Sequence, residues 1–192
     1  MIRDATATRA RILEAAAVEF AEHGLAGARV DRLAELAGAN KQRIYANFGS
    51  KEGLFDAALE GKIGELLDTV PFDATDLPGY SERLFDFTVA HPELIRLVLW
   101  HSLERPGALT EMEAAGGSTA HKVALLLQAQ QAGVVDDYLP PERIVSLILG
   151  IVHASLLLGP LPDDAAEMAA QRAAVRAAVQ RLVTPVGKPI SG

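Results

Sequence analysis

The sequence predicts an all-α protein, and three observations support this fold class. Apolar residues recur at intervals of three and four along most of the chain, as on one face of a helix. Glycines and prolines separate these stretches at positions where helices commonly end or begin. One short segment, 30–48, has the pattern of two helices joined by a tight turn. With 49% hydrophobic residues in a chain of 192, there is ample material for a buried core.

The first helix of segment 30–48 has an apolar stripe at positions i, i+3, i+4 and i+7, formed by Val30, Leu33, Ala34 and Ala37. Gly38 can end this helix because glycine adopts the left-handed conformation without steric cost. Asn40 can then cap a second helix that begins near Lys41. Two short helices joined by a glycine-containing turn form a helix-turn-helix.

In the second helix, Ile44 and Phe48 lie four residues apart and are expected to face inward. The side chains left to face outward are Lys41, Gln42, Arg43, Tyr45, Ala46 and Asn47. Cations, amides and a phenol are groups that hydrogen-bond to phosphates and base edges. We interpret this helix as a DNA-reading helix. The alternative is a short polar helix that only faces water, since the motif alone does not establish DNA binding.

The net charge of −7 is unevenly distributed. Residues 1–51 carry eight Lys and Arg against six Asp and Glu, whereas residues 52–192 carry ten against nineteen. A weakly basic N-terminal part on an acidic remainder presents one end of the molecule to a phosphate backbone.

The preceding residues predict a helix over 8–23 that is ended by Gly24, after a loose arm over 1–7. Its apolar face is formed by Leu13, Ala16, Ala17 and Phe20. Arg9 and Arg11 are either phosphate contacts or solvated surface charges.

Gly49 and Ser50 interrupt the chain after the reading helix, and Ser50 is a suitable N-cap for a long helix over 51–70. The apolar face of that helix is formed by Phe55, Leu59, Ile63, Leu66, Leu67 and Val70. Lys51 lies in the first turn, where free backbone N–H groups and a cation can share one phosphate.

The run RILEAAAVEFAEHGLAGARVDRLAELAGANKQRIYANFGSKEGLF, within residues 9–60, resembles the N-terminal domain of the tetracycline-repressor (TetR) family of transcriptional regulators. The resemblance implies a three-helix DNA-binding head over 1–50 and an all-helical body over 51–184. The first helix of the body would connect the two parts, and residues 185–192 would form a flexible tail. The resemblance further implies that the body forms a homodimer and holds a small-molecule effector, and that Tyr45 and Lys51 contact phosphate.

The sequence departs from the family pattern at several positions. Ala28 replaces a common threonine, which removes one expected backbone contact. Arg29 replaces a small hydroxyl residue and is expected to contact phosphate itself, with assistance from Lys41. The positions that differ in the reading helix are the ones expected to read bases: Gln42, Arg43 and Asn47.

The remainder of the chain predicts five further helices. Three of them cover residues 80–90, 118–132 and 164–183. Of the other two, one begins at 91–93 and ends before 106–107, and the other begins at 140–142. Residues 71–79 are expected to form a loop, and residues 108–117 an irregular or briefly helical segment. The run 144–159 is the most apolar, but its sixteen residues are shorter than the ~20 that a membrane span needs. We therefore expect a buried helix and no membrane association.

The last two helices have small and aliphatic faces, including Ser146, Gly150 and Ala154 at intervals of four. Such faces suit a four-helix interface between two identical subunits, and the alternative is that they pack only within one chain. A dimer would place two reading helices about 34–36 Å apart, as successive major-groove faces require.

No catalytic pattern is present. The sequence lacks cysteine, a GxSxG elbow, a P-loop, a dinucleotide-binding glycine fingerprint and HExxH, so no enzyme, cofactor or metal is expected. His101 and Glu104 have a spacing found in some metal sites, but we interpret them as a solvated or ion-paired couple.

A ligand pocket is expected among the apolar helices of the body, since such pockets combine apolar walls with few polar groups. The candidate ligand-binding residues are Phe87, Arg96, Trp100, His101, His121 and His153. For the histidines and Trp100, the alternative is a role as core residues.

The N-terminus lacks the apolar core of a signal peptide. The prediction is thus a cytoplasmic, homodimeric repressor that binds double-stranded operator DNA and is released by a small, largely apolar effector. The alternative is a helical protein-interaction module with a vestigial helix-turn-helix.

Overall fold

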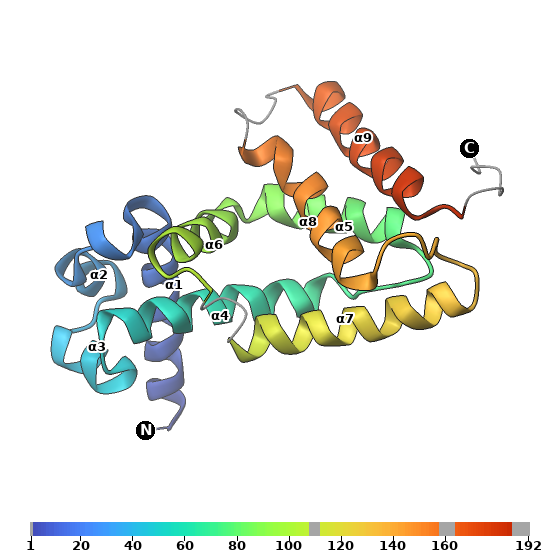
Figure 1. Ribbon diagram of the computed structural model, residues 1–192. Helices are drawn as coiled ribbons and strands as arrows, with labels where there is room; N and C mark the ends of the chain where they lie inside the picture. Colours follow the sequence, from blue (N-terminus) through green and yellow to red (C-terminus); the bar gives the residue numbers. More distant parts are fainter. Residues whose placement is uncertain (1, 108–111, 158–163, 186–192) are drawn as a thin grey trace. The chain divides into compact units, whose positions relative to one another are not determined.

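The computed structural model describes residues 2–107, 112–157 and 164–185, and over these residues the fold is entirely helical (Figure 1). The helices are α1 (Ile2–Gly27), α2 (Val30–Ala37), α3 (Lys41–Phe48), α4 (Lys51–Thr69), α5 (Leu77–Ala90), α6 (Pro92–Glu104), α7 (Glu113–Gln131), α8 (Pro141–Leu157) and α9 (Ala165–Val183). The all-α prediction is confirmed.

The chain divides into two compact units. The first unit comprises Met1–Leu66 and His91–Gly116, and the second comprises Leu67–Ala90 and Gly117–Gly192. The first unit therefore contains not only the three N-terminal helices but also most of α4 and the whole of α6.

The core of the first unit is built around two aromatic rings. Phe20 of α1 and Phe55 of α4 are fully buried and meet edge to face, with their centroids 4.9 Å apart. The ring of His101 from α6 stacks on Phe55 at 5.7 Å. Aromatic pairs of this kind add to the free energy gained from burial alone. This core holds α1, α4 and α6 as one scaffold for the short helices α2 and α3.

In the second unit, α5 packs against α8 and α9. Leu84, Phe85, Val152 and Val179 are buried there, each at most 1% exposed. At the edge of this core, the Arg172 guanidinium on α9 donates hydrogen bonds to the carboxylates of Asp86 and Glu82 on α5, at 2.8–3.0 Å. These ion pairs link α9 to α5 at the rim of the core.

The start of the chain differs from the prediction. Helix α1 begins at Ile2, so the expected loose arm over residues 1–7 is wrong for residues 2–7. The alanines and aspartate in this segment are compatible with a helix, and no breaker separates them from the predicted start. The break at Gly24 is confirmed, because its φ of 67° interrupts α1.

Two other helices begin earlier than predicted. Helix α5 starts at Leu77 because Asp76 caps it, with its Oδ1 accepting a hydrogen bond from the Gly79 N–H at 2.9 Å. Helix α7 starts at Glu113, so residues 113–117 are helical rather than irregular. Of the rest of the predicted irregular segment, Met112 is not helical, and residues 108–111 lie outside the described part of the chain, as do 186–192 of the predicted tail.

Within the described residues, none of the helices has the length and apolarity needed to cross a membrane. Helix α8, the most apolar, spans only Pro141–Leu157.

Candidate nucleic-acid interface

The turn between α2 and α3 is formed as the sequence predicts. Gly38 has a φ of 58° and ends α2, and its N–H is bonded to the carbonyls of Ala34 and Glu35. Asn40 caps α3, with its Oδ1 accepting a hydrogen bond from the Arg43 N–H at 2.8 Å. Together these contacts satisfy backbone groups at the end of one helix and the start of the next.

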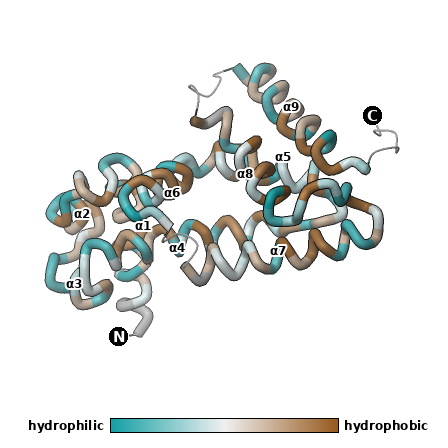
Figure 2. The backbone as a smooth tube through the Cα atoms, in the orientation of Figure 1, coloured by the Kyte–Doolittle hydropathy of each residue, from teal (hydrophilic) through white to brown (hydrophobic). Residues whose placement is uncertain are grey.

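Helix α3 has one buried edge and one open face. Ile44 is 1% exposed and Phe48 is half-buried against the first unit, whereas the six residues predicted to face outward are all exposed. Figure 2 shows mainly hydrophilic colouring along this helix. Because α3 is buried along one edge only, its exposed side chains can be inserted into the major groove of DNA.

The three predicted base-reading residues lie on this open face. In the described part of the chain, no carboxylate pairs with the Arg43 guanidinium, so its donors are available to an incoming partner. The Asn47 Nδ2 donates to the carbonyl of Arg43 at 2.6 Å, which leaves its Oδ1 as the outward-facing acceptor. Gln42 is exposed beside them.

The Lys41 side chain already has a partner within the motif. Its ammonium group forms an ion pair with Asp31 of α2. The hydrogen bond to this carboxylate raises the pKa of Lys41. Since both side chains are more than half exposed, the pair is weak and a phosphate can compete for the lysine.

The predicted phosphate contacts surround the motif. Tyr45 is 44% exposed on α3. Arg29 precedes α2, where its backbone N–H donates to Glu19 at 2.7 Å while its side chain is exposed. Lys51 opens α4, and its Nζ donates to the carbonyl of Ala26 at 3.3 Å. Beside it, Ser50 Oγ accepts from the Gly53 N–H at 3.0 Å, which confirms the predicted cap.

An unpredicted ion pair positions α2 on α1. Glu19 is only 3% exposed, and its carboxylate accepts hydrogen bonds from Arg32 Nη2 at 2.7 Å and from the Arg29 N–H. Burial opposes ionisation of Glu19, but these hydrogen bonds outweigh it and lower the pKa. The signal in the sequence was weak: Glu19 lies three residues after Ala16, at the edge of the apolar stripe of the first helix.

Helix α6 also forms hydrogen bonds with α1 near Gly24. The Glu104 carboxylate accepts from the N–H groups of Leu25 at 2.7 Å and Ala26 at 3.2 Å. The Trp100 indole N–H donates to the carbonyl of Ala21 at 3.3 Å. These residues therefore hold the segment that leads from α1 into α2.

Three of the six predicted ligand-binding residues thus belong to the first unit. Trp100 is in contact with α1, and Arg96 is exposed and lines a shallow groove beside Ala21 and Pro92. His101 is fully buried, and burial lowers its pKa even though its Nε2 lies 3.5 Å from the Asp56 carboxylate. Among the described residues no group of three or more potential ligands could hold a metal ion.

The other three belong to the second unit. Phe87 is buried, His121 is exposed, and His153 is half-buried on α8, where burial lowers its pKa to about 4. A pocket in this unit is lined by other residues, which the sequence did not single out: Phe72, Tyr80, Lys122, Val145, Ile148 and Leu149.

These features define the class of protein. A capped, glycine-turned pair of short helices with an open polar face, on a helical scaffold joined to a second helical unit, is the architecture of a helix-turn-helix DNA-binding regulator.

Comparison with known proteins identifies the family. Residues 12–58 match the family described as bacterial regulatory proteins, tetR family, and residues 76–181 match the tetracyclin repressor-like C-terminal domain. The HTH-type transcriptional repressor SCO4008 of Streptomyces coelicolor is 43% identical over 157 residues, which is 81% of this chain and 82% of that protein. The chain therefore belongs to the TetR family and is a DNA-binding transcriptional regulator.

Solved structures agree with this assignment. The putative transcriptional regulator SCO4942 from Streptomyces coelicolor superposes with a TM-score of 0.79 at 36% identity, over 92% of this chain and 98% of that chain. FadR from Bacillus subtilis, solved in complex with stearoyl-CoA, has a TM-score of 0.68 at 19% identity, over 88% and 96%, and shows the shared fold alone. The reading of the chain as an interaction module with a vestigial motif is not favoured.

Proposed function

We propose that the chain acts as a homodimeric, cytoplasmic repressor that binds a pseudo-palindromic operator and leaves it when a small, largely apolar molecule binds. The observation that carries the proposal is the open face of α3, where all six outward-facing residues are exposed while Ile44 is buried. Exposed cations and amides on a groove-sized helix are the groups that hydrogen-bond to phosphates and base edges.

The proposed roles divide the motif into two sets. Gln42, Arg43 and Asn47 read base edges in the major groove, and the Arg43 fork is suited to the two acceptors of a guanine. The residues proposed to clamp the backbone are Arg29, Lys41, Tyr45 and Lys51. Lys51 acts together with the N-terminus of α4, whose positive dipole end attracts an anion.

The dimer is supported by the outer faces of α8 and α9. Leu147 is 43% exposed, and Ser146 and Gly150 on the same helix are exposed as well. On α9 the exposed residues include Ala166, Ala169, Ala170, Ala173 and Ala177. Small and aliphatic side chains allow helices of two subunits to approach closely, as in a four-helix bundle. Apolar faces left open in one chain are typical of such interfaces.

Release requires that the effector distinguish two conformers. A ligand with equal affinity for both conformers does not change their populations. The effector must therefore bind more tightly to the conformer whose reading helices are wrongly spaced for the operator. The effector-binding residues expected from the sequence are divided between the two units: Arg96, Trp100 and His101 lie in the first, and Phe87, His121 and His153 lie in the second. The effector is proposed to bind within the second unit. That a regulator of the same fold was solved with stearoyl-CoA is compatible with a small-molecule effector here.

The test is binding of the full-length protein to DNA from upstream of its own gene, followed by fluorescence anisotropy at several salt concentrations. We expect affinity to fall steeply as salt rises, because phosphate contacts release counterions. We expect Arg43→Ala to cost about 1–3 kcal/mol per half-site and to relax the sequence preference.

Arg83→Ala is the matched control, since it removes an arginine from α5 in the second unit. If Arg43→Ala keeps wild-type affinity and selectivity, the base-reading assignment fails. If binding does not depend on salt, DNA contact through this face fails as a whole.

A further inference from the structure

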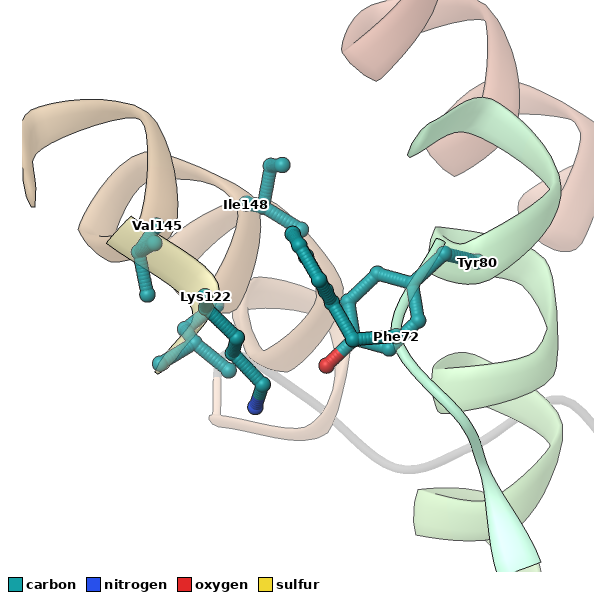
Figure 3. A pocket seen from close by; sticks show the side chains of 6 residues that line it. Phe72, Tyr80, Lys122, Val145 and Ile148 are labelled. Atoms are coloured by element: carbon teal, nitrogen blue, oxygen red, sulfur yellow. The ribbon is translucent and has the colours of Figure 1, made fainter. Parts of the chain in front are cut away.

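The pocket of the second unit has an unusual combination of walls. Its cavity volume is about 10 Å³, roughly the room for one water molecule, and it is lined by Phe72 after α4, Tyr80 of α5, Lys122 of α7, and three aliphatic residues of α8: Val145, Ile148 and Leu149 (Figure 3). Five of the six lining side chains are aromatic or aliphatic. A single amine therefore provides the only formal charge on this lining.

Lys122 lies in this pocket without an anion. Its Nζ is 5.9 Å from the ring centroid of Phe72 and 5.7 Å from that of Tyr80. Over the described residues no carboxylate pairs with it, and burial alone lowers its pKa. Cation–π contacts offset only part of the cost of removing an ammonium group from water. A buried charge in a pocket is stabilised more fully by a bound ion of opposite sign.

Tyr80 adds a second polar group to the same place. Its side chain is buried, which raises its pKa to about 12, so the hydroxyl stays protonated and can donate a hydrogen bond. In Figure 3 the Tyr80 oxygen and the Lys122 nitrogen lie on the same side of the pocket. A pocket lined by both an ammonium group and a phenol offers two hydrogen-bond donors to an oxyanion.

We propose that this pocket binds a small carboxylic acid with an apolar body, whose carboxylate pairs with Lys122 and accepts from Tyr80 while its body packs on Ile148 and Leu149. This inference deepens the proposed function, since the acid would be the effector. An amine would be repelled by Lys122. A neutral ligand would leave the ammonium without a counter-ion.

In this structure the pocket is closed to such a molecule, since its volume is about 10 Å³ whereas ligand pockets are typically about 300–1,000 Å³. The pocket walls must therefore move apart for the acid to bind. Phe72 is the mobile wall in this proposal, because it is only half-buried and lies in the connection between α4 and α5. Its displacement would act directly on the C-terminal end of α4, the helix that begins with Lys51. A ligand-dependent shift of α4 is therefore the expected consequence of binding.

The test is calorimetric titration of the full-length protein with benzoate and octanoate, each compared with its neutral amide. We expect at least one acid to bind and its amide to bind at least roughly tenfold more weakly, as for a hydrogen-bonded charge. The two acids differ in body shape, so their order of affinity shows whether a flat or a flexible body fits.

Lys122→Met should lower the affinity for the acid by about tenfold to a hundredfold. Lys122→Arg should retain part of the binding, and Tyr80→Phe should weaken it less than Lys122→Met does. Arg143→Met, an exposed residue of α8 outside the lining, is the control for loss of one positive charge. In the free protein Lys122→Met should raise the melting temperature, because it removes a buried charge without an anion.

The outcomes separate this inference from the proposed function. Acid and amide binding equally, or Lys122→Met binding the acid as the wild type does, overturns the acid site. Binding of neither acid also overturns it, and leaves operator binding unaffected. Acid binding that depends on Lys122 but leaves operator affinity unchanged supports the site and overturns release by this ligand.

Discussion

At the scale of single residues, a few side chains hold the DNA-facing part of the molecule in place. Glu19 joins α1 to the start of α2 through Arg32, and Trp100 closes over Gly24. These contacts link residues that are between 13 and 79 positions apart in the chain. The residues beneath α3 define the surface on which this helix is presented.

Gly24→Ala tests this packing. A Cβ at Gly24 would lie 2.8 Å from the Trp100 ring, and the φ of 67° is unfavourable for alanine as well. We expect a loss of about 2–4 kcal/mol in the free energy of unfolding from strain and overpacking together. Urea denaturation of the wild type and the variant measures this difference in the free energy of unfolding.

Gly38→Ala is the matched control, because its φ of 58° is similar but no atom lies within 4 Å of the added Cβ. It should cost only the backbone strain, about 1 kcal/mol. Equal losses for the two variants would exclude a packing role for Trp100 at Gly24.

His153 gives the protein a pH-dependent stability. Its folded-state pKa of about 4 lies below the usual 6.5 because burial disfavours the charged ring. Between pH 6.5 and pH 4, His153 therefore binds a proton in the unfolded chain but stays neutral in the folded chain. This stabilisation is present above pH 6.5 and is lost as the pH falls toward 4, by up to about 3 kcal/mol.

Melting temperatures of wild type and His153→Gln between pH 7 and pH 4 test this prediction. The variant should show a shallower decline across that range. The lowered pKa of His101 is common to both proteins and cancels in the comparison. Parallel pH profiles would show that His153 does not titrate as assigned.

At the scale of elements, the important pairing is α6 on α1. Although α6 lies far along the sequence, it belongs to the first unit and its Glu104 satisfies two backbone N–H groups after Gly24. A carboxylate that accepts from successive N–H groups acts like a helix cap supplied by another helix. These contacts tie α6 to the segment that leads into α2.

Glu104→Ala removes that cap. We expect a loss of about 1–3 kcal/mol in stability, because two backbone donors lose a charged acceptor. Hydrogen exchange of the Leu25 and Ala26 amides should become faster. Glu60→Ala, at an exposed position of α4, is the control and should leave both amides unchanged. Unchanged exchange in Glu104→Ala would show that water replaces the carboxylate without cost.

At the scale of the whole molecule, the proposed activity depends on a second copy of the chain. One α3 helix contacts one half-site, and only a dimer places two of them on one duplex at the spacing of a helical turn. The exposed faces of α8 and α9 are the surfaces that we expect to be covered in that dimer.

Gly150→Glu tests this interface by placing a charge on the exposed face of α8. A carboxylate buried between subunits without a partner is strongly unfavourable, so the variant should be monomeric by light scattering and should lose operator affinity. Its helical content should be retained. Tyr138→Glu, at a residue 86% exposed, is the control and should remain dimeric. A dimeric Gly150→Glu protein would place the interface elsewhere.

Local sequence was sufficient to predict the helix-turn-helix and its open face. Gly38, Asn40 and Ser50 act on backbone groups within a few residues, so their effect on helix ends is the same wherever the helices later pack. The 3.6-residue periodicity likewise separated buried Ile44 from exposed Arg43 and Tyr45. The helical fold class was predictable for the same reason, although the starts of α1, α5 and α7 were placed too late.

What the tertiary structure alone decided is which distant polar groups meet. The pairing of Glu19 with Arg32, the contact of Glu104 with Leu25, and the placement of Lys122 beside the Phe72 and Tyr80 rings depend on the packing of separate segments. Periodicity shows which face of a helix is apolar but not which neighbour covers it. For that reason the sequence determined the reading helix and its capping residues, whereas the contacts beneath it and the pocket around Lys122 were decided by helix packing.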